Sequence, residues 1–502
     1  MKKGAFSMKK SGRTPLVKAL EKHMKLNPVP FHMPGHKNGR GIQKKFAGLM
    51  QDNPFHMDLT ELPGLDDLHN PTGPIKEAQI RAARLFGADK TFFLVNGTTV
   101  GLHAAILSAC RPGDEILLPR EAHRSVIGAC VLGGLYPRYL PLNLDRDYFI
   151  PYPSRTEEIC LALKKYPTVS AVLQVYPSYY GLAGDVAGAA GTAHARGIPL
   201  IVDEAHGAHF RFSSRLPATA IESGADIAVQ STHKTLGSFT QASMLHIRSS
   251  LIDGGEVARH LAILQSTSPS YLLMASLDAA TGHLESAGES LIDKTVRNAY
   301  RIRKKLKAIP GIRCLGDDVE GKIGEMAVDP TKIYVSVKEL GLSGYRVAET
   351  LLRDHNIQVE MSDRFNILCM FSLGNTYGDG DRLARALKDI SASARGLGEK
   401  RAPKRARKRI QGFSNIKTFP VPDVIMNPRD AWFAEKKCIL LKDAAGETAG
   451  EIIAPYPPGV PLVCPGETIT PEIIELIREF KAASGYFHGP ADPELKFITV
   501  ID

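Results

Sequence analysis

The sequence has no long apolar run and few cysteines, and both absences narrow the classes of protein that it can encode. No apolar stretch approaches the ~18–20 residues that a membrane-spanning helix needs. The basic start is followed at 14–25 by an amphipathic pattern without an apolar core, which is not the pattern of a secretory signal. The seven cysteines include no CxxC pair, which argues against a disulfide framework and a zinc knuckle. We therefore expect a cytoplasmic protein.

The net charge of +10 does not describe the body of the protein. Residues 2–13 carry five positive charges and residues 400–409 carry seven, so the rest of the chain has a net charge of −2. Short basic runs of this kind are usually solvated and support only salt-sensitive, non-specific contacts with polyanions. We expect neither a specific nucleic-acid partner nor a membrane partner.

Two apolar runs end in polar residues that can carry chemistry. Residues 199–202 are apolar and lead into Asp203, and residues 225–229 lead into QSTHK, which ends at Lys234. Polar groups just past the carboxyl ends of parallel strands stand where ligands bind. An acid that keeps a ring nitrogen protonated and a lysine that forms a Schiff base are the two residues that grip pyridoxal phosphate. The sequence therefore indicates a cofactor of this type.

The rest of the chain alternates between short apolar runs and helical patterns, which predicts an α/β fold with a mostly parallel sheet covered on both faces. The strands expected for this sheet are 91–95, 115–118, 138–142, 171–175, 199–202, 227–230 and, as an edge strand, 243–247. After a long helix at 272–308, a smaller α/β unit has expected strands at 332–337, 357–361 and 367–371 and a helix at 379–395. The last domain has an expected strand at 451–454 and a helix at 471–482.

These patterns suggest five segments. They are an N-terminal arm (1–74), a large cofactor domain (75–310), a small α/β domain (311–397), a basic linker (398–412) and a C-terminal α+β domain (413–502). The family resemblance described below implies that the N-terminal arm wraps the active site and a dimer neighbour.

The letters of Asp203-Glu-Ala-His206 also form the box of a helicase family. That interpretation fails because the chain contains no GxxxxGK[ST] segment to hold the phosphates of a nucleotide. A pyridoxal-phosphate aminotransferase or aldolase is the nearer alternative, since such enzymes share the acid, the lysine and the phosphate site. A binding protein without activity is disfavoured, because both Asp203 and Lys234 are present.

Several motifs occur in an order that resembles the ornithine/lysine/arginine decarboxylase family over nearly the whole chain. They are FHMPGHKNG (31–39), DLTELPGLDDLHNPTG (58–73), NGTTVGLHA (96–104), REAHRS (120–125), DEAHG (203–207), QSTHK (230–234), QSTSPSYLL (265–273) and APYPPGVPLVCPGE (454–467). The resemblance is to the compact biosynthetic branch. It implies a large domain like that of aspartate aminotransferase and decarboxylation of a basic amino acid. It favours L-arginine, giving agmatine and CO2 for polyamine synthesis, with lysine and ornithine left open.

The resemblance also implies roles for single residues. Lys234 should hold pyridoxal phosphate, Asp203 should pair with its ring nitrogen, and His123 should stack on the outer face of the ring. Ala205 is small enough to pack flat against the inner face. Ser266 and Thr267 resemble positions that reach into a neighbouring subunit's site, which implies a homodimer or larger homo-oligomer.

The cofactor's phosphate should lie at the turn that follows the first strand. Gly97, Thr98 and Thr99 open a helix there, and free amides at a helix start favour an anion. Ser231 and His233 are expected to complete this phosphate site from the lysine side, and Lys234 or His233 to return a proton to the substrate.

His206 is also expected to contact the cofactor. It forms an HxxH pair with His209, but no third ligand stands at motif spacing, so we expect no metal.

The far end of a basic substrate requires a carboxylate, which can bind a guanidinium through two oxygens. Glu467 in the PGE turn is the first candidate, and Asp67 and Glu204 are the alternatives. A turn leading into the helix at 471–482 explains Glu467 equally well, so the sequence leaves the choice open.

Overall fold

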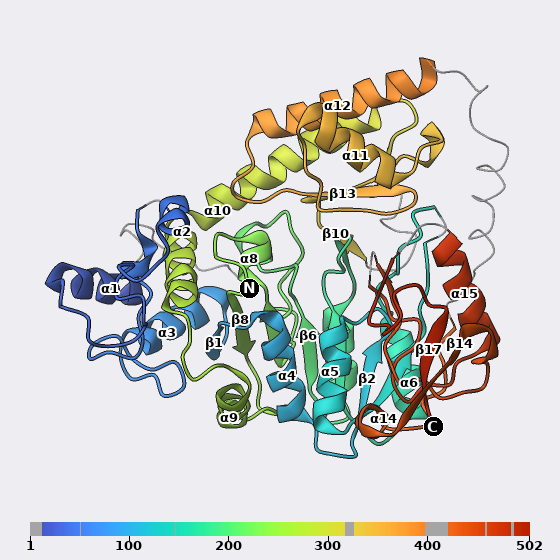
Figure 1. The fold of residues 1–502 in the computed structure, drawn as a ribbon, viewed down its shortest axis with the longest axis horizontal. Helices are drawn as coiled ribbons and strands as arrows, with labels where there is room; N and C mark the ends of the chain where they lie inside the picture. Colours follow the sequence, from blue (N-terminus) through green and yellow to red (C-terminus); the bar gives the residue numbers. More distant parts are fainter. Residues whose placement is uncertain are drawn as a thin grey trace. The chain divides into compact units, whose positions relative to one another are not determined.

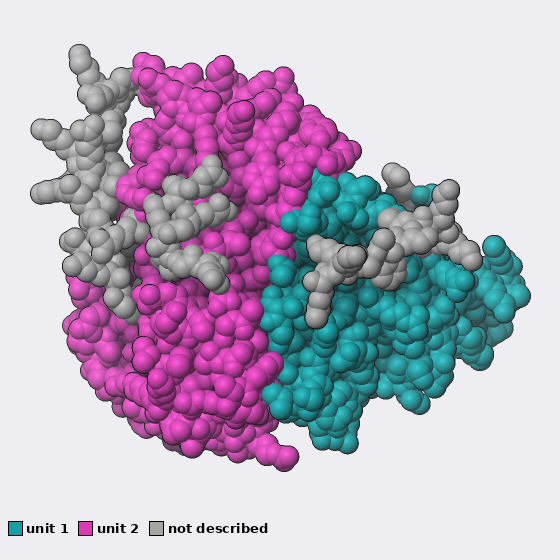
Figure 2. Space-filling model, turned by 180° about the vertical axis from the view of Figure 1, so that it is seen from behind, with its two compact units in different colours: residues 1–108, 203–214, 218–293 teal, residues 109–202, 215–217, 294–502 magenta. Residues whose placement is uncertain are grey.

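The computed structural model describes residues 13–50, 52–145, 147–316, 326–396, 420–456, 459–482 and 486–502. The chain divides into two compact units, which Figure 2 shows in different colours. Unit 1 comprises Met1–Ser108, Asp203–Ser214 and Ala218–Asp293, and unit 2 comprises Ala109–Val202, Arg215–Pro217 and Lys294–Asp502. Among the residues described, no helix is long and apolar enough to cross a bilayer.

Unit 1 contains the strands and helices that lead to and follow the lysine. They are α1 (Pro15–Leu26), α2 (Lys44–Leu49), α3 (Pro74–Phe86), β1 (Lys90–Leu94), α4 (Gly97–Ala109), β7 (Ile227–Gln230), α8 (Thr232–Thr235), β8 (Ser243–Ile247), α9 (Gly254–Leu264) and the start of α10 (Tyr271–Lys307), and Figure 1 labels most of them. Short 3-10 turns at Pro54–His56 and Phe210–Phe212 complete the unit.

Strand β8 is not the edge strand that the sequence suggested. It pairs antiparallel with β1 on one side and with β7 on the other, from Ile247 opposite Lys90 and Ile227 to Met244 opposite Phe93 and Gln230. All five side chains of β8 are buried, as expected for a strand with neighbours on both sides. The edge prediction was wrong because it followed the order of strands along the chain, whereas β8 inserts between β1 and β7.

Helix α4 packs unusually close to the strands beneath it. A Cβ atom on Gly101 would lie 2.4 Å from Cγ1 of Val229 in β7 and 2.6 Å from Cδ1 of Leu94 in β1. Real Cβ atoms do not approach other carbons so closely, so this position accepts only glycine without a shift of the helix. The close approach brings the first turn of α4 near the end of β7.

The segment between α1 and α3 has little regular structure. Asp66 organises its last part. Its carboxylate accepts hydrogen bonds of 2.8–3.2 Å from backbone amides of residues 67, 72, 73, 75 and 76. Burial alone would raise the pKa of Asp66, but these amides, led by those of Thr72 and Gly73, lower it. Asp66 therefore fixes the entry to α3 and has a structural role.

Unit 2 contains the parallel part of the predicted sheet, in the order β6-β4-β2-β3. Its strands are β2 (Glu115–Pro119), β3 (Tyr136–Leu140), β4 (Val169–Val175) and β6 (Leu200–Asp203), and its helices are α5 (Arg124–Gly133), α6 (Thr156–Lys165) and α7 (Val186–His194). Strand β2 pairs in parallel with both β3 and β4. The predicted α/β class with a mostly parallel sheet is confirmed, and β6 ends at Asp203, as expected.

A second sheet in unit 2 has the order β12-β13-β11-β9 and is antiparallel. It consists of β9 (Arg313–Cys314), β11 (Lys332–Ser336), β12 (Met361–Ser362) and β13 (Asn366–Met370), with α11 (Gly344–His355) and α12 (Tyr377–Gly396). The strand predicted at 357–361 is wrong except for Met361. Asn356 ends α11 in the left-handed conformation and the amide of Ile357 bonds back to Leu351, so the chain enters the sheet only afterwards.

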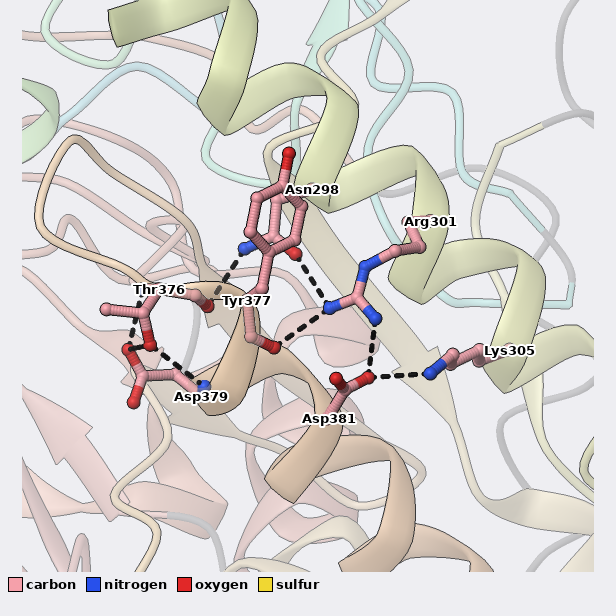
Figure 3. Close-up of polar contacts among 7 residues, drawn as sticks. All are labelled: Asn298, Arg301, Lys305, Thr376, Tyr377, Asp379 and Asp381. Carbon is pink, nitrogen blue, oxygen red and sulfur yellow. Dashed lines mark hydrogen bonds and ion pairs between the residues drawn. The ribbon is translucent and has the colours of Figure 1, made fainter.

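Polar contacts join the second half of α10 to the start of α12 (Figure 3). Arg301 donates to Asp381 at 2.6 Å and to the carbonyl of Tyr377 at 2.8 Å, and Lys305 donates to Asp381 at 2.6 Å. Asn298 donates to the carbonyl of Thr376 at 3.0 Å. These groups are partly exposed, so they orient the two helices and stabilise them only modestly.

The C-terminal part of unit 2 has its own hydrophobic core, which includes Ile453, Ile473 and Val500. Its elements are α14 (Pro428–Phe433), β14 (Lys436–Leu440), β15 (Ala454–Tyr456), α15 (Pro471–Ala482), β16 (Tyr486–His488) and β17 (Phe497–Ile501). The predicted helix is present, and the strand predicted at 451–454 is shifted to β15. The antiparallel pair β14–β17 was missed. The basic linker predicted at 398–412 lies outside the described residues.

Candidate active site

Asp203 and Lys234 both belong to unit 1, one at the end of a strand and the other just after a strand. Asp203 is the last residue of β6, and Lys234 lies in the single turn α8 that follows β7. The amide of Glu204 donates to the carbonyl of Val229 at 3.0 Å. This hydrogen bond joins the residue after Asp203 to the end of strand β7. The two residues predicted to grip the cofactor are therefore carried by neighbouring, hydrogen-bonded segments.

The Lys234 side chain is directed to a histidine. Its Nζ lies 3.0 Å from Nε2 of His206, which is 7% exposed. A lysine must lose a proton before it can act as a nucleophile, and a neutral imidazole is an acceptor for that proton. His206 thus contacts the predicted nucleophile, which is a more specific role than the general cofactor contact inferred from the sequence.

His233, the residue before the lysine, is held in one tautomer. Its Nδ1 lies 3.0 Å from the carbonyl oxygen of Ala242, which can only accept, so Nδ1 carries the proton. Burial lowers the pKa of His233, and the neighbouring Lys234 lowers it further. A neutral ring with its Nε2 lone pair available can accept a proton or a hydrogen bond from a ligand.

The two halves of the predicted phosphate site come together. The hydroxyls of Thr98, in the first turn of α4, and Ser231, just after β7, are 2.6 Å apart, and both are buried. Thr99, next to Thr98, is exposed. Gly97 has a φ of 72° and its amide already donates to the carbonyl of Gln241 at 2.8 Å. Gly97 therefore shapes the turn, and the donors for an anion are those of its neighbours.

The acid is placed deep enough to protonate a ring nitrogen. Asp203 is 5% exposed, and its Oδ1 accepts the amide of Ala205 at 3.1 Å. Ala205 is itself buried, and its single methyl group leaves a flat surface beside the acid.

Residues 266–268 form an exposed loop of unit 1. The carbonyl of Ser266 bonds to Nε2 of His69 at 2.9 Å, and Gln265 accepts the amide of Val95 at 2.9 Å. Thr267 is exposed, as a residue that reaches a neighbouring subunit must be when one chain is viewed alone.

His123 and Glu467 belong to unit 2. His123 caps the start of α5, and its Nδ1 accepts the amide of Ser125 at 3.2 Å. Its ring is exposed. The cap explains how the ring is held in one orientation.

The carboxylate of Glu467 is already paired with a cationic side chain of the same protein. It is 1% exposed, and its two oxygens accept from Arg120 at 2.5 and 2.8 Å, with the amide of Cys464 at 2.8 Å. Arg120 also donates to two backbone carbonyls, and its guanidinium lies 4.5 Å from the centre of the Tyr139 ring. We correct the expectation that Glu467 faces the substrate, because the guanidinium that it binds is part of the same chain.

Glu204 is corrected for a similar reason. It has no exposed surface, and its oxygens accept from the amide of Ala220 at 2.8 Å and from the side chain of Gln230 at 2.9 Å. Asp67 remains as the substrate-facing candidate. One of its oxygens accepts the amide of His69 at 2.8 Å, in a partly exposed turn.

Together these side chains fit pyridoxal phosphate. A lysine, a buried acid and a pair of buried hydroxyls at a helix start are the groups that would bind its aldehyde, its ring nitrogen and its phosphate. Across the described ranges, no three His, Cys, Asp or Glu residues are placed to hold a metal ion.

Comparisons with known proteins identify the family of this chain. The family model for the Orn/Lys/Arg decarboxylase major domain matches residues 14–379, and the model for the C-terminal domain of the same family matches residues 413–490. The chain belongs to the Orn/Lys/Arg decarboxylase family. It is an α/β decarboxylase, as the motifs predicted.

Individual relatives refine the comparison. The chain is 40% identical over 488 residues to an arginine decarboxylase of Bacillus subtilis, covering 97% of this chain and 98% of the relative. It is 27% identical to the lysine decarboxylase LdcA of Pseudomonas aeruginosa, covering 93% of this chain and 76% of the relative. The crystal structure of the Francisella novicida lysine decarboxylase LdcF shares the fold, with a TM-score of 0.83 and 23% identity over 97% of this chain and 81% of that one.

Sequence reasoning missed the residues that hold the site residues in place. Arg120 and Gln230 are each the first residue of a motif that was noticed, and each is a large polar residue at the end of an apolar strand. A polar residue at a strand end needs a buried partner, and this is the signal that could have identified both.

Proposed function

We propose that this decarboxylase converts L-arginine to agmatine and CO2 with pyridoxal phosphate as its cofactor. The observation that carries the choice of arginine is the 40% identity to an arginine decarboxylase over nearly the full length of both chains. The lysine decarboxylases are more distant in sequence. A decarboxylase of this specificity would serve polyamine synthesis in the cytoplasm.

Bound pyridoxal phosphate supplies an electron sink that accepts the electron pair left when CO2 departs. The chain's own residues prepare and direct that chemistry. Asp203 would keep the ring nitrogen protonated from a buried position, and Thr98, Thr99 and Ser231 would hold the phosphate. Ala205 and His123 would lie against the two faces of the ring.

We assign proton transfer to Lys234 and the histidines beside it. His206 accepts from Nζ of Lys234 and would keep the amine in its reactive neutral form. After loss of CO2, Lys234 or His233 would return a proton to Cα of the substrate. His233 could do so only after Nε2 has taken up a proton, because its Nδ1 proton is held by the Ala242 carbonyl. A substrate carboxylate shielded from water by Thr267 of a second subunit would complete the site.

The substrate's guanidinium requires an anion, and Asp67 is the carboxylate that we propose for it. Its second oxygen has no hydrogen bond within the described parts of the chain. The proposed homodimer would place exposed residues of one copy, including Thr267, near the site of the other.

The function is tested by assaying the purified protein with arginine, lysine and ornithine and identifying the products by chromatography. Arginine should give agmatine at a rate at least tenfold above that with either alternative, since a site built for a planar guanidinium discriminates strongly against an ammonium. Borohydride should fix the cofactor covalently to Lys234, and Lys234→Ala should abolish both labelling and turnover. Equal activity with lysine would refute the choice of arginine, and turnover by Lys234→Ala would refute the assigned lysine.

A further inference from the structure

Four buried polar side chains form a continuous hydrogen-bonded chain through unit 1. Thr91 of β1 bonds to Nδ1 of His246 in β8 at 2.8 Å, and Nε2 of His246 bonds to Oε1 of Gln230 at the end of β7 at 3.1 Å. Gln230 then donates to Glu204 at 2.9 Å. No member is more than 2% exposed.

The hydrogen bonds of this network all run in one direction, from donor to acceptor, and Glu204 determines that direction. The amide nitrogen of Gln230 donates to Oε2 of Glu204, so Gln230 presents its carbonyl oxygen to His246. His246 must therefore carry its proton on Nε2 and accept the Thr91 hydroxyl on Nδ1. Burial lowers the pKa of His246 to about 3, so the ring is neutral, and Phe86 stacks on it with the ring centres 4.8 Å apart. Each bond in the chain then pairs a donor with an acceptor.

The inner end of this chain lies between the two residues assigned to the cofactor. Glu204 directly follows Asp203, and Gln230 directly precedes the turn that carries Ser231 and Lys234. A single backbone bond, from the amide of Glu204 to the carbonyl of Val229, also joins the two segments. The Glu204–Gln230 bond adds a directional side-chain link at the same place.

We propose that Glu204 and Gln230 are positioning residues, which hold Asp203 and Lys234 at the spacing that pyridoxal phosphate requires. This inference rests on the proposed function, because it assumes that both residues grip that cofactor. Apolar side chains would pack the same space, but they would not fix the two segments in one register. A fully paired polar network does so, at the risk that breaking one member leaves several groups unpaired.

An exchange of the two side chains tests the link. Gln230→Glu places two carboxylates together, whereas in Glu204→Gln the Gln230 amide and the His246 tautomer can both reverse and keep each bond paired. The double variant Glu204→Gln/Gln230→Glu restores a donor and an acceptor to each bond. The amide introduced at position 204 can accept from Ala220 and donate to the carboxylate introduced at position 230, and that carboxylate accepts from His246.

The measurements are cofactor affinity by equilibrium dialysis, the pH titration of the cofactor's visible absorption, and kcat and KM for arginine. The affinities and rates are compared at pH ~9, where Glu204 is ionised, since burial raises its pKa to about 8.

Gln230→Glu should lose on the order of tenfold in cofactor affinity and in kcat, with KM for arginine little changed, because a buried hydrogen bond is replaced by two facing carboxylates. Glu204→Gln should lose less. The double variant should return to within about threefold of the wild type. The matched control is Ile227→Ala, at the other end of β7 and equally buried. It should lower the melting temperature at least as much as the single variants do, without shifting the absorption titration.

The proposal is overturned if the exchanged pair binds cofactor no better than Gln230→Glu does, or if Gln230→Glu matches the wild type. If the single variants fail to fold, Thr91→Val is a milder change, because it removes only the hydrogen bond to His246 at the end of the network far from Glu204. We expect it to lower cofactor affinity by about threefold. No loss in Thr91→Val, together with no recovery in the exchanged pair, refutes the link. A wild type without lysine-bound cofactor would refute the proposed function instead, so the two failures are distinguishable.

Discussion

Two buried glutamates, one in each unit, show how differently the same side chain can be accommodated. Glu467 in unit 2 meets the guanidinium of Arg120 through two hydrogen bonds, whereas Glu204 in unit 1 meets only uncharged amides of Gln230 and Ala220. Both residues follow a short motif and both were candidates for binding a basic substrate. A carboxylate at a strand end or turn is therefore as suited to fixing the fold as to binding a ligand, and its partner decides which.

The charge environments of the two residues differ accordingly. Burial raises the pKa of Glu204 to about 8, and its two amide partners oppose that change only in part. In unit 2, the loss of hydration disfavours the charged form of Arg120, but Glu467 more than compensates, and the pKa of Arg120 is raised. One glutamate is thus sensitive to pH near neutrality, and the other is one half of a permanent ion pair.

The largest effect should come from breaking the ion pair on one side. Glu467→Gln leaves the guanidinium of Arg120 buried without its counter-ion, which costs about 3–5 kcal/mol. Scanning calorimetry should show a marked fall in the melting temperature of the variant. The control is Glu349→Gln, which removes an exposed partner of Arg346 and should cost at most about 1 kcal/mol. Equal losses in the two variants would contradict the buried pair's role.

Removing both charges should be far milder than removing one. Arg120→Met/Glu467→Leu replaces the pair with apolar side chains of similar length, and exchanges of this kind are often neutral or stabilising by about 1–4 kcal/mol. The double variant should melt well above Glu467→Gln in the same calorimetric scan. A double variant as unstable as the single one would mean that the backbone carbonyls bonded to Arg120 are the essential partners.

The third effect is a pH dependence of stability to which Glu204 contributes, together with other acids whose pKa burial raises, such as Glu121 and Asp278. An acid with a raised pKa binds its proton more tightly in the folded state than in the unfolded one. Its contribution to stability is therefore largest at low pH and falls as pH rises from about 4.5 to about 8, by up to ~1.4 kcal/mol per pH unit. In cofactor-free protein, Glu204→Gln should flatten the stability profile across that window, measured by urea unfolding at several pH values. An unchanged slope would show that Glu204 is ionised throughout.

The residues that we propose to be reactive follow from local order in the sequence. Asp203 and Lys234 stand at the ends of apolar runs, and that pattern also placed the parallel strands of unit 2 correctly. Partners far apart in the chain could not be predicted this way. Nothing near Glu467 points to Arg120, which is 347 positions away.

The missed strands have a similar cause. Strand β14 pairs with β17 across more than 50 intervening residues, and each strand is short and partly exposed. Strand β8 has the same composition whether it lies at an edge or between two neighbours, so its position depends on the register with β1 and β7. The protein carboxylate expected to bind the substrate's guanidinium was misassigned. The exposure of a side chain depends on the folded chain and cannot be read from the motif.

The hydrogen bonds of Asp66 affect how tolerance to substitution at this position should be interpreted. Its carboxylate gathers five backbone amides from a non-glycine residue with a φ of 83°, so asparagine, alanine and glutamate would each leave several of those amides unpaired. In a library of random variants, position 66 would be depleted as strongly as the catalytic lysine. Depletion at this position would therefore report the cost of building the loop, and its neighbour Asp67 would be the informative position for substrate choice.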